Sequence, residues 1–363
     1  MKVPFIDFSF DLEGNEDEYS NLLLRHIRNG EFIGGNAVNE FEEKLSKYLK
    51  TENVVTVGNG TDALIIALES LELKNKEVIV PAFSFFATSE AVVQAGLIPK
   101  FVDVSLDDCN IDINQIEKNI TENTGAILPV HLFGKSCEMS DILSIADNYN
   151  LKIIEDTAQS FGTKNNEKYL GTIGDAGCFS FFPTKTLGAY GDGGAIVTDD
   201  PKIANRARML KNHGASKKYY NEIMGYNSRL DSIQASFLDI KLTKINKLLA
   251  LRKEAGEFYN KILKDNENFT IVGNQDSSFN YYSIILNNGS RDKLQTHLSE
   301  EGISSTIYYP RTLPSLPAHN IKDSFSNAEF LSKNILALPI FPSISRDQQL
   351  YVSKIINEYF LKS

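Results

Sequence analysis

Lys185 is the residue of this chain whose type and setting point most directly to chemistry. It follows the apolar run 178–182, has a threonine on either side and precedes the glycine-rich residues 191–194. Desolvation lowers the pKa of a lysine, and a neutral lysine amine can condense with an aldehyde to form an imine. The alternative is a solvated lysine on a surface loop, and four other segments of the chain argue against it.

Asp156 and Gln159 follow the apolar residues 151–154. A carboxylate at the carboxyl end of a buried strand lies where parallel sheets bind ligands. Asp156 could there keep a pyridinium nitrogen protonated, which makes the ring an electron sink, and Gln159 could reach an oxygen of the same ring. Glu155 is expected to face the opposite side of the sheet. The alternative for Asp156 is a cap on the following helix.

Residues 58–64, Gly-Asn-Gly-Thr-Asp-Ala-Leu, join the end of a predicted strand to the start of a helix. The free amides near Gly60 and the hydroxyl of Thr61 would suit a phosphate group. Ser180 could supply a second hydroxyl. A helix capped by Thr61 or Asp62 is the alternative interpretation.

Two further segments contain candidate binding residues. Phe85 could cover one face of a flat ring, whereas Phe83 and Phe86 are expected in the core. Asn227 and Arg229 precede a long helical stretch and could bind phosphate or substrate. The alternative there is a loop that ends in a helix cap.

The composition excludes several classes of protein. The chain has 363 residues, of which 42% are hydrophobic and 23% charged, and its formal net charge is −10, which argues against nonspecific nucleic-acid binding. No apolar run is long enough to cross a membrane, and the first residues do not resemble a signal peptide. Three scattered cysteines indicate a reducing cytoplasm rather than a disulfide framework. The histidines lack metal-ligand spacing, so no metal is expected.

The pattern of apolar runs predicts an α/β fold. Strands are predicted at 53–57, 77–81, 99–104, 125–132, 151–156, 178–182 and 194–198, with helices between several of them. This order predicts a mostly parallel sheet with ligand sites at strand-to-helix turns. A helix over 232–263 leads to a smaller α+β domain, in which strands are predicted at 269–272, 280–285 and 304–308. We place a large domain at 1–245 and a small one at 246–363.

Taken together, these segments resemble the DegT/DnrJ/EryC1/StrS family of sugar aminotransferases, which are pyridoxal-phosphate enzymes of fold type I. The resemblance covers nearly the whole chain and includes, in order, residues 32–35, 41–42, 58–64, 155–159, 179–185, 191–194 and 225–231. It implies an aspartate-aminotransferase-like fold with a seven-stranded sheet in the large domain.

The resemblance implies pyridoxal 5′-phosphate as the cofactor. Lys185 would be joined to it through an imine, Asp156 would bind the pyridine nitrogen and Gln159 the ring oxygen. It further implies Lys185 as the general base and acid of a transamination, in which glutamate is the amino donor and 2-oxoglutarate the product.

The other cofactor contacts also follow from the resemblance. Phe85 would stack on the ring, and Gly60, Thr61 and Ser180 would surround the phosphate. Asn227 resembles the residue that reaches the phosphate of the neighbouring subunit, which implies an obligatory homodimer with shared active sites.

The motif around Lys185 is similar to that of members that aminate carbon 3 of a nucleotide-linked keto-sugar, whereas members acting at carbon 4 more often have Gly-Asn-Lys there. One segment departs from the family: residues 308–314 lack its usual histidine. Tyr308, Tyr309 and Arg311 could replace it, with Arg229 as a further substrate contact.

The expected activity is therefore transfer of an amino group to a keto-sugar of the UDP-2-acetamido-3-oxo-glucose type, in amino-sugar biosynthesis for surface polysaccharide or lipopolysaccharide. A dTDP-3-oxo-6-deoxyhexose and a 4-keto-sugar are alternative substrates. A dehydratase is disfavoured because it would replace Lys185 with histidine, and a regulator because Lys185 and Asp156 are both present. An amino-acid aminotransferase would need a carboxylate-clamping arginine, for which Arg311 is a poor candidate.

Overall fold

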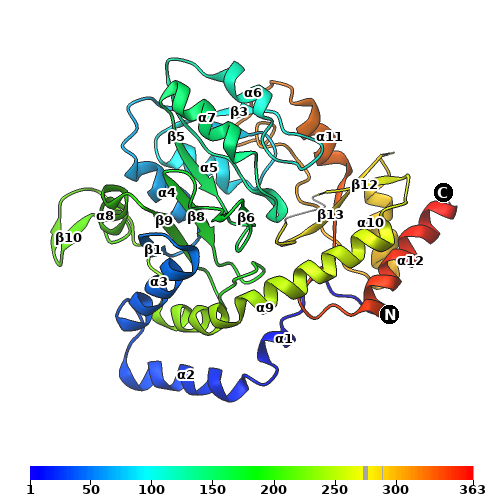
Figure 1. Cartoon of the computed structure of the whole chain (residues 1–363), viewed down its shortest axis with the longest axis horizontal. Coiled ribbons are helices and arrows are strands. Elements are labelled where there is room, and N and C mark those ends of the chain that lie inside the picture. Colours follow the sequence, from blue (N-terminus) through cyan, green and yellow to red (C-terminus); the bar gives the residue numbers. More distant parts are fainter. Residues whose placement is uncertain (273–276, 288, 363) are drawn as a thin grey trace.

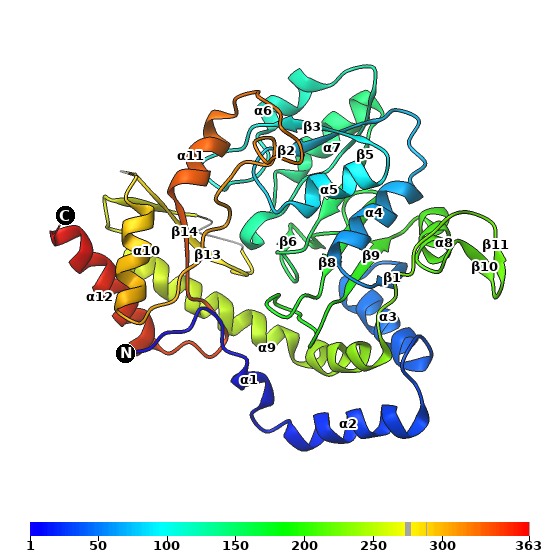
Figure 2. The same cartoon turned by 180° about the vertical axis from the view of Figure 1, so that it is seen from behind.

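The computed structural model describes residues 1–272, 277–287 and 289–362, and a seven-stranded sheet forms its centre (Figures 1 and 2). The strands are β1 (Asn53–Val57), β2 (Glu77–Pro81), β3 (Ile98–Val102), β4 (Thr124–Ile127), β5 (Lys152–Asp156), β8 (Ala176–Ser180) and β9 (Gly194–Thr198). Each overlaps a predicted strand. The largest difference is at β4, which ends at Ile127 instead of residue 132.

The sheet is mostly parallel, as predicted. Its spatial order is β1-β9-β8-β5-β4-β2-β3, and β3, β2, β4, β5 and β8 run in the same direction. Strand β9 runs antiparallel to both of its neighbours, β1 and β8. Asp156 in β5 pairs with Cys178 in β8, so the carboxyl ends of these strands, including Ser180, lie at one edge.

Helices cover both faces of the sheet. On one face are α4 (Gly60–Ser70), α5 (Ala87–Gln94) and α8 (Pro201–Leu210), and on the other α3 (Asn36–Leu49), α7 (Met139–Tyr149) and part of α9 (Ser232–Leu263). The side chains of each strand alternate between the two cores: Val55 packs under α4, whereas Val54 packs under α3 and α9. This explains why the strands are apolar at consecutive positions.

The C-terminal part contains a separate antiparallel sheet and its helices (Figure 1). Its elements are β12 (Phe269–Ile271), β13 (Tyr282–Leu286), α10 (Arg291–Glu300), α11 (Ser326–Asn334), β14 (Ile335–Leu338) and α12 (Arg346–Lys362). The prediction of a strand at 304–308 is wrong, because there only Thr306 pairs, in a single bridge with Ala337. The third strand is β14, which the sequence pattern did not reveal.

Helix α9 has the predicted bounds and connects the two parts. Leu238 and Leu242 pack in the core beside the large sheet, whereas Tyr259 and Leu263 pack in the C-terminal core. The predicted domain boundary at 245/246 falls inside this helix, and the division into domains stays a prediction.

The remaining elements lie outside the two larger sheets. They are α1 (Ser9–Leu12), α2 (Glu16–Asn29), α6 (Ile113–Ile116), the 3-10 turns at Glu117–Asn119 and Leu132–Gly134, and the hairpins β6–β7 (Lys164–Asn165, Lys168–Tyr169) and β10–β11 (Ala215–Lys217, Tyr220–Asn221). The β10–β11 hairpin projects from the body in both views (Figures 1 and 2). Within the residues described, every helix is too short or too polar to cross a membrane.

Candidate active site

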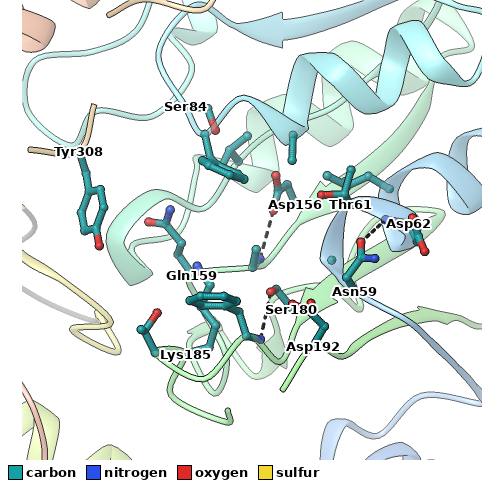
Figure 3. Close-up of a pocket in the computed structure, with 18 of the residues that line it drawn as sticks. Asn59, Thr61, Asp62, Ser84, Asp156, Gln159, Ser180, Lys185, Asp192 and Tyr308 are labelled. Carbon is teal, nitrogen blue, oxygen red and sulfur yellow. Dashed lines mark hydrogen bonds between the residues drawn. The ribbon is translucent and has the colours of Figure 1, made fainter. Parts of the chain in front are cut away.

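A cavity of about 630 Å³ lies at the carboxyl ends of β5 and β8, where the parallel strands predict a ligand site (Figure 3). It brings together nine of the residues that the sequence singles out: Gly60, Thr61, Phe85, Asp156, Gln159, Ser180, Lys185, Tyr308 and Tyr309. These residues are up to 249 positions apart in the chain, from 60 to 309. The candidate residues thus share one site.

Asp156 is a buried carboxylate at the floor of the cavity, with 5% of its surface exposed. Its Oδ2 accepts a hydrogen bond from the Thr88 hydroxyl at 2.9 Å, and its Oδ1 accepts one from the Ala158 N–H at 3.1 Å. Burial raises the pKa of this carboxyl above its usual value, although both hydrogen bonds oppose the rise. In the described structure the residues directly after Asp156 form turns and no helix, so the alternative of a helix cap is not supported.

Lys185 lies on a tight turn that its own N–H closes by donating to the Phe182 carbonyl at 2.9 Å. Its Nζ lies 5.6 Å from the centre of the Tyr281 ring. Within the described residues, no carboxylate forms an ion pair with this Nζ. Lys185 is also the one cationic side chain among the described residues that line the cavity. Its amine is therefore available to a ligand.

Helix α4 begins at the cavity with free backbone amides. Asn59, rather than Thr61 or Asp62, caps it: the Asn59 Oδ1 accepts a hydrogen bond from the Asp62 N–H at 2.8 Å. The first helical N–H groups, those of Gly60 and Thr61, have no partner within the helix. A Cβ added at Gly60 would lie 2.7 Å from the Ser180 Cβ, so only glycine permits this close approach of α4 to β8.

Aromatic side chains form one wall of the cavity. Phe85 lines the opening with 55% of its surface exposed, and its ring centre lies 5.9 Å from that of Tyr309. The Tyr308 and Tyr281 ring centres are 4.5 Å apart. Burial raises the pKa of the Tyr281 hydroxyl, but the Lys185 amine and hydrogen bonds with Thr184 and Tyr308 outweigh it and lower the pKa overall.

Three candidate residues do not line the cavity of the single chain. Asn227 is exposed and forms a β-bridge with Asn212, and Arg311 is exposed as well. Arg229 is half-buried beside Ser228, whose hydroxyl donates to the Asp62 Oδ2 at 2.6 Å. The loop that contains Asn227 and Arg229 is therefore attached to the start of α4, outside the enclosed space.

Glu155 points away from the cavity, as predicted, and is fully buried. Its carboxylate accepts hydrogen bonds from His131 Nε2 at 3.0 Å and from the N–H groups of Gly171 (2.8 Å), Ile173 (2.7 Å) and Gly174 (2.7 Å). Burial alone would raise the pKa of Glu155, but these donors lower it overall. His131 thus has a structural role in holding the end of β5.

Sequence reasoning did not single out several residues of the site. Ser84, Thr184, Tyr281 and Asp192 line the cavity, and Thr88 holds Asp156 from beneath it. The Ser84 and Thr88 hydroxyls are 2.9 Å apart, and because Thr88 donates to Asp156, Ser84 must be the donor to Thr88. The sequence signal that could have indicated Ser84 and Thr88 is that they are hydroxyl residues shortly after a buried strand.

These residues fit a pyridoxal phosphate group. Burial destabilises the charged form of the Asp156 carboxyl, and a protonated ring nitrogen beside it would stabilise that form. The unpartnered amides of α4 and the Ser180 hydroxyl suit a phosphate, and the Lys185 amine is free for the aldehyde. The Phe85 ring is exposed to the cavity and can cover a planar ring.

Comparison with known proteins shows the family of the chain. A model of the DegT/DnrJ/EryC1/StrS aminotransferase family matches residues 14–357. A pleiotropic regulatory protein of Geobacillus stearothermophilus is 38% identical, over 99% of this chain and 99% of its own. A UDP-N-acetyl-3-dehydro-alpha-D-glucosamine 3-aminotransferase of Acidithiobacillus ferrooxidans is 37% identical, over 98% and 97%.

Two solved structures are similar over nearly the whole chain. DesV of S. venezuelae, in complex with a ketimine intermediate, has a TM-score of 0.94 and 34% identity, and the match covers 99% of this chain and 98% of that one. NtdA of Bacillus subtilis, with bound cofactor PMP, has a TM-score of 0.90 and 30% identity, with coverages of 98% and 85%.

The fold is therefore that of the fold-type-I pyridoxal-phosphate aminotransferases. This chain belongs to the DegT/DnrJ/EryC1/StrS aminotransferase family. The family's cofactor is pyridoxal phosphate, as the sequence predicted, and several of the relatives are named as nucleotide-sugar aminotransferases.

Proposed function

We propose that this chain transfers an amino group from glutamate to carbon 3 of a nucleotide-linked keto-sugar, with pyridoxal phosphate as cofactor. The observation that carries the proposal is the presence of two groups in one cavity. One is Asp156, a buried carboxylate with a raised pKa, and the other is Lys185, an amine with no ion-pair partner in the described structure.

The roles of these residues follow from their surroundings. When bound, the cofactor supplies a ring that accepts electrons from the substrate carbon. Asp156, fixed by Thr88 and Ala158, holds the proton on the ring nitrogen. Lys185 Nζ would be the amine that holds the aldehyde of the cofactor, and once free it would carry a proton to or from the substrate carbon. Gln159 contacts the ring oxygen.

The other contacts complete the cofactor site. The N–H groups of Gly60 and Thr61 and the Ser180 hydroxyl bind the phosphate, and Phe85 covers one ring face. Such a cover restrains the ring and limits the access of water to the reacting atoms.

The substrate assignment depends on the relatives as well as on the cavity. The Acidithiobacillus ferrooxidans relative is named a 3-aminotransferase for a UDP-linked sugar, which supports a substrate of the UDP-2-acetamido-3-oxo-glucose type. A dTDP-3-oxo-6-deoxyhexose or a 4-keto-sugar is the alternative, because other relatives are named for dTDP- and GDP-linked sugars. The product would enter amino-sugar biosynthesis for surface polysaccharide or lipopolysaccharide in the cytoplasm.

A second copy of the chain would complete the site. Asn227 is exposed outside its own cavity, so in a dimer its side chain would be free to bind the cofactor phosphate of the partner subunit. Apolar side chains that a partner would cover lie exposed near the cavity mouth and in the N-terminal segment, among them Phe182 (49%), Phe32 (45%) and Ile33 (54%). Tyr308, Arg229 and Arg311 are the proposed contacts to the sugar nucleotide.

Turnover measurements with a panel of keto-sugars test the proposal. With glutamate as donor, the UDP-linked 3-oxo-sugar should be aminated faster than dTDP-linked 3-oxo-sugars and 4-keto-sugars. Holoprotein should absorb visible light and be trapped by borohydride at Lys185, and Lys185→Ala should lose both properties. Failure of the wild-type protein to become coloured with pyridoxal phosphate would overturn the proposal.

One relative is named as a regulatory protein, so a non-enzymatic role was considered. The presence of Lys185 and Asp156 in one cavity favours an enzyme, because a pure regulator has no need for the reactive amine. Absence of turnover with every keto-sugar, in a protein that still binds the cofactor, would reverse this preference.

A further inference from the structure

Gln159, which points into the cavity (Figure 3), is in contact with Tyr309, although the two residues are 150 positions apart in sequence. The Gln159 Nε2 donates a hydrogen bond to the Tyr309 hydroxyl oxygen at 2.9 Å. The Gln159 Oε1 accepts a hydrogen bond from the Phe133 N–H, also at 2.9 Å. Gln159 is buried, with 5% of its surface exposed, and yet it lines the cavity.

These two contacts determine which way the Gln159 amide faces. A backbone N–H can only donate, so the side-chain atom beside the Phe133 N–H must be the oxygen. The NH₂ group then lies on the side of Tyr309. It has two hydrogens, and the Tyr309 oxygen takes one of them. The second remains for a ligand in the cavity.

Tyr309 is itself held in place by its surroundings. Its ring lies 6.1 Å from the Phe83 ring and 5.9 Å from the Phe85 ring. The segment that carries it is attached to the large sheet, because the Leu313 N–H donates to the Ala82 carbonyl at 2.9 Å. The Tyr309 hydroxyl is thus a fixed acceptor for Gln159.

We propose that Tyr309 is a positioning residue, whose hydroxyl fixes Gln159 so that the second amide N–H faces an anionic oxygen of the bound ligand. The inference deepens the proposed function and rests on it, since the oxygen meant is the ionised ring hydroxyl of the cofactor. Tyr309 therefore acts on the cofactor through Gln159, instead of binding the sugar as the sequence suggested.

The protonation state of Tyr309 agrees with this role. Burial raises the pKa of the Tyr309 hydroxyl well above its usual value, against the smaller effect of the Gln159 hydrogen bond. The hydroxyl therefore stays neutral throughout the working pH range.

Spectroscopic titration of holoprotein tests the inference without measuring activity. A hydrogen-bond donor lowers the proton affinity of an anionic oxygen. Loss of the fixed donor in Tyr309→Phe should therefore raise the pH midpoint of the visible absorbance change by roughly 0.5–1 unit. Tyr149→Phe removes an exposed hydroxyl that bonds Glu117 outside the cavity, and should leave the midpoint unchanged.

A double-mutant cycle separates positioning from direct contact. Gln159→Ala alone should raise the midpoint, and adding Tyr309→Phe to it should cause no further shift. Gln159→Glu is a second variant: it keeps both contacts, with Tyr309 now donating, but removes the cavity-facing N–H, and so also raises the midpoint. This variant keeps the test open if Tyr309→Phe does not fold.

The outcomes are distinct. A shift by Tyr309→Phe that persists in the Gln159→Ala background would show direct action of Tyr309 and overturn the inference. An unchanged midpoint in folded, cofactor-loaded Tyr309→Phe or Gln159→Ala would overturn it as well. Wild-type protein that never acquires the visible band would overturn the proposed function instead.

Discussion

Replacement of Asp156 by asparagine should abolish most of the activity while leaving the fold intact. In the structure the Asp156 carboxylate accepts one hydrogen bond from Thr88 and one from Ala158. Asparagine can keep both contacts: its oxygen accepts from the Ala158 N–H, and its NH₂ donates to Thr88. The Thr88 proton can then turn to the Ser84 oxygen, which lies 2.9 Å away.

The magnitude of the stability effect follows from this count of bonds. Unfolding entropy of about 2.1 cal/mol/K per residue, over 363 residues, gives about 0.8 kcal/mol/K. Because Asp156→Asn keeps both hydrogen bonds, the free energy of unfolding of the apoprotein should change by no more than about 1 kcal/mol, which shifts Tm by no more than about 1 °C. Asp156→Ala leaves two buried donors unpaired, at about 1–3 kcal/mol each, and should lower Tm by about 3–8 °C.

The stability of the apoprotein should depend on pH in a definite direction, because the pKa of Asp156 is raised in the folded state. Because burial raises the folded-state pKa of Asp156, the folded state binds more protons than the unfolded state just above the unfolded pKa of about 3.9. Wild-type apoprotein should therefore lose stability relative to Asp156→Asn as the pH rises from about 4 through the folded pKa.

Activity should fall much further than stability. Loss of a preorganised charge partner in a buried site costs about 10²–10³ in kcat. The assay is release of 2-oxoglutarate from glutamate with the keto-sugar at saturation, beside calorimetry of the apoproteins. The reasoning is refuted if Asp156→Asn loses several degrees of Tm and its activity falls only as far as its folded fraction.

Two further substitutions test other parts of the site. Gly60→Ala places a Cβ 2.7 Å from the Ser180 Cβ and should separate α4 from β8. In an absorbance titration of the apoprotein, this variant should bind pyridoxal phosphate at least ~10-fold more weakly. An unchanged Kd would count against the phosphate site. Glu155→Gln removes the oxygen that accepts hydrogen bonds from His131 Nε2 and the Gly171 N–H, and each lost bond costs about 1.5–3 kcal/mol. This variant should therefore lower Tm by about 4–8 °C. The control Glu43→Gln changes an exposed carboxylate and should leave Tm unchanged. Since the pKa of Glu155 is lowered in the folded state, its contribution is present above pH ~4.3 and lost on acidification, so the two Tm curves should converge at low pH.

The sheet was predictable because burial on both faces leaves a clear pattern. The bounds of β1, β2, β9 and α9 agree with the prediction to the residue. These strands are short runs of β-branched and other apolar residues between polar or glycine-containing turns, and such runs are typical of strands that are buried on both faces. The sequence pattern did not predict β14, because its four apolar residues follow α11 directly and resemble a continuation of that helix.

The site was predictable only in part. Residues such as Lys185 and Asp156 have a chemical type and a position at a strand end that indicate function. The cap of α4 depends on the extended backbone of Asn59, with φ −165° and ψ 175°, which composition does not reveal. Tyr281 stands beside a buried strand and reads as a core residue, and only the packing of the C-terminal part against the large sheet brings its ring next to Lys185.

Lys241 connects α9 directly to the turn that carries Lys185. This lysine is 5% exposed, and its Nζ donates to the Gly188 carbonyl at 2.9 Å, pairs with Asp11 at 2.7 Å and lies 3.9 Å from the Tyr190 ring centre. A helix of 32 residues is about 48 Å long and nearly rigid. Because α9 packs in both cores, a movement of the C-terminal part along this helix would reach the turn that carries Lys185 through the contact between Lys241 and Gly188.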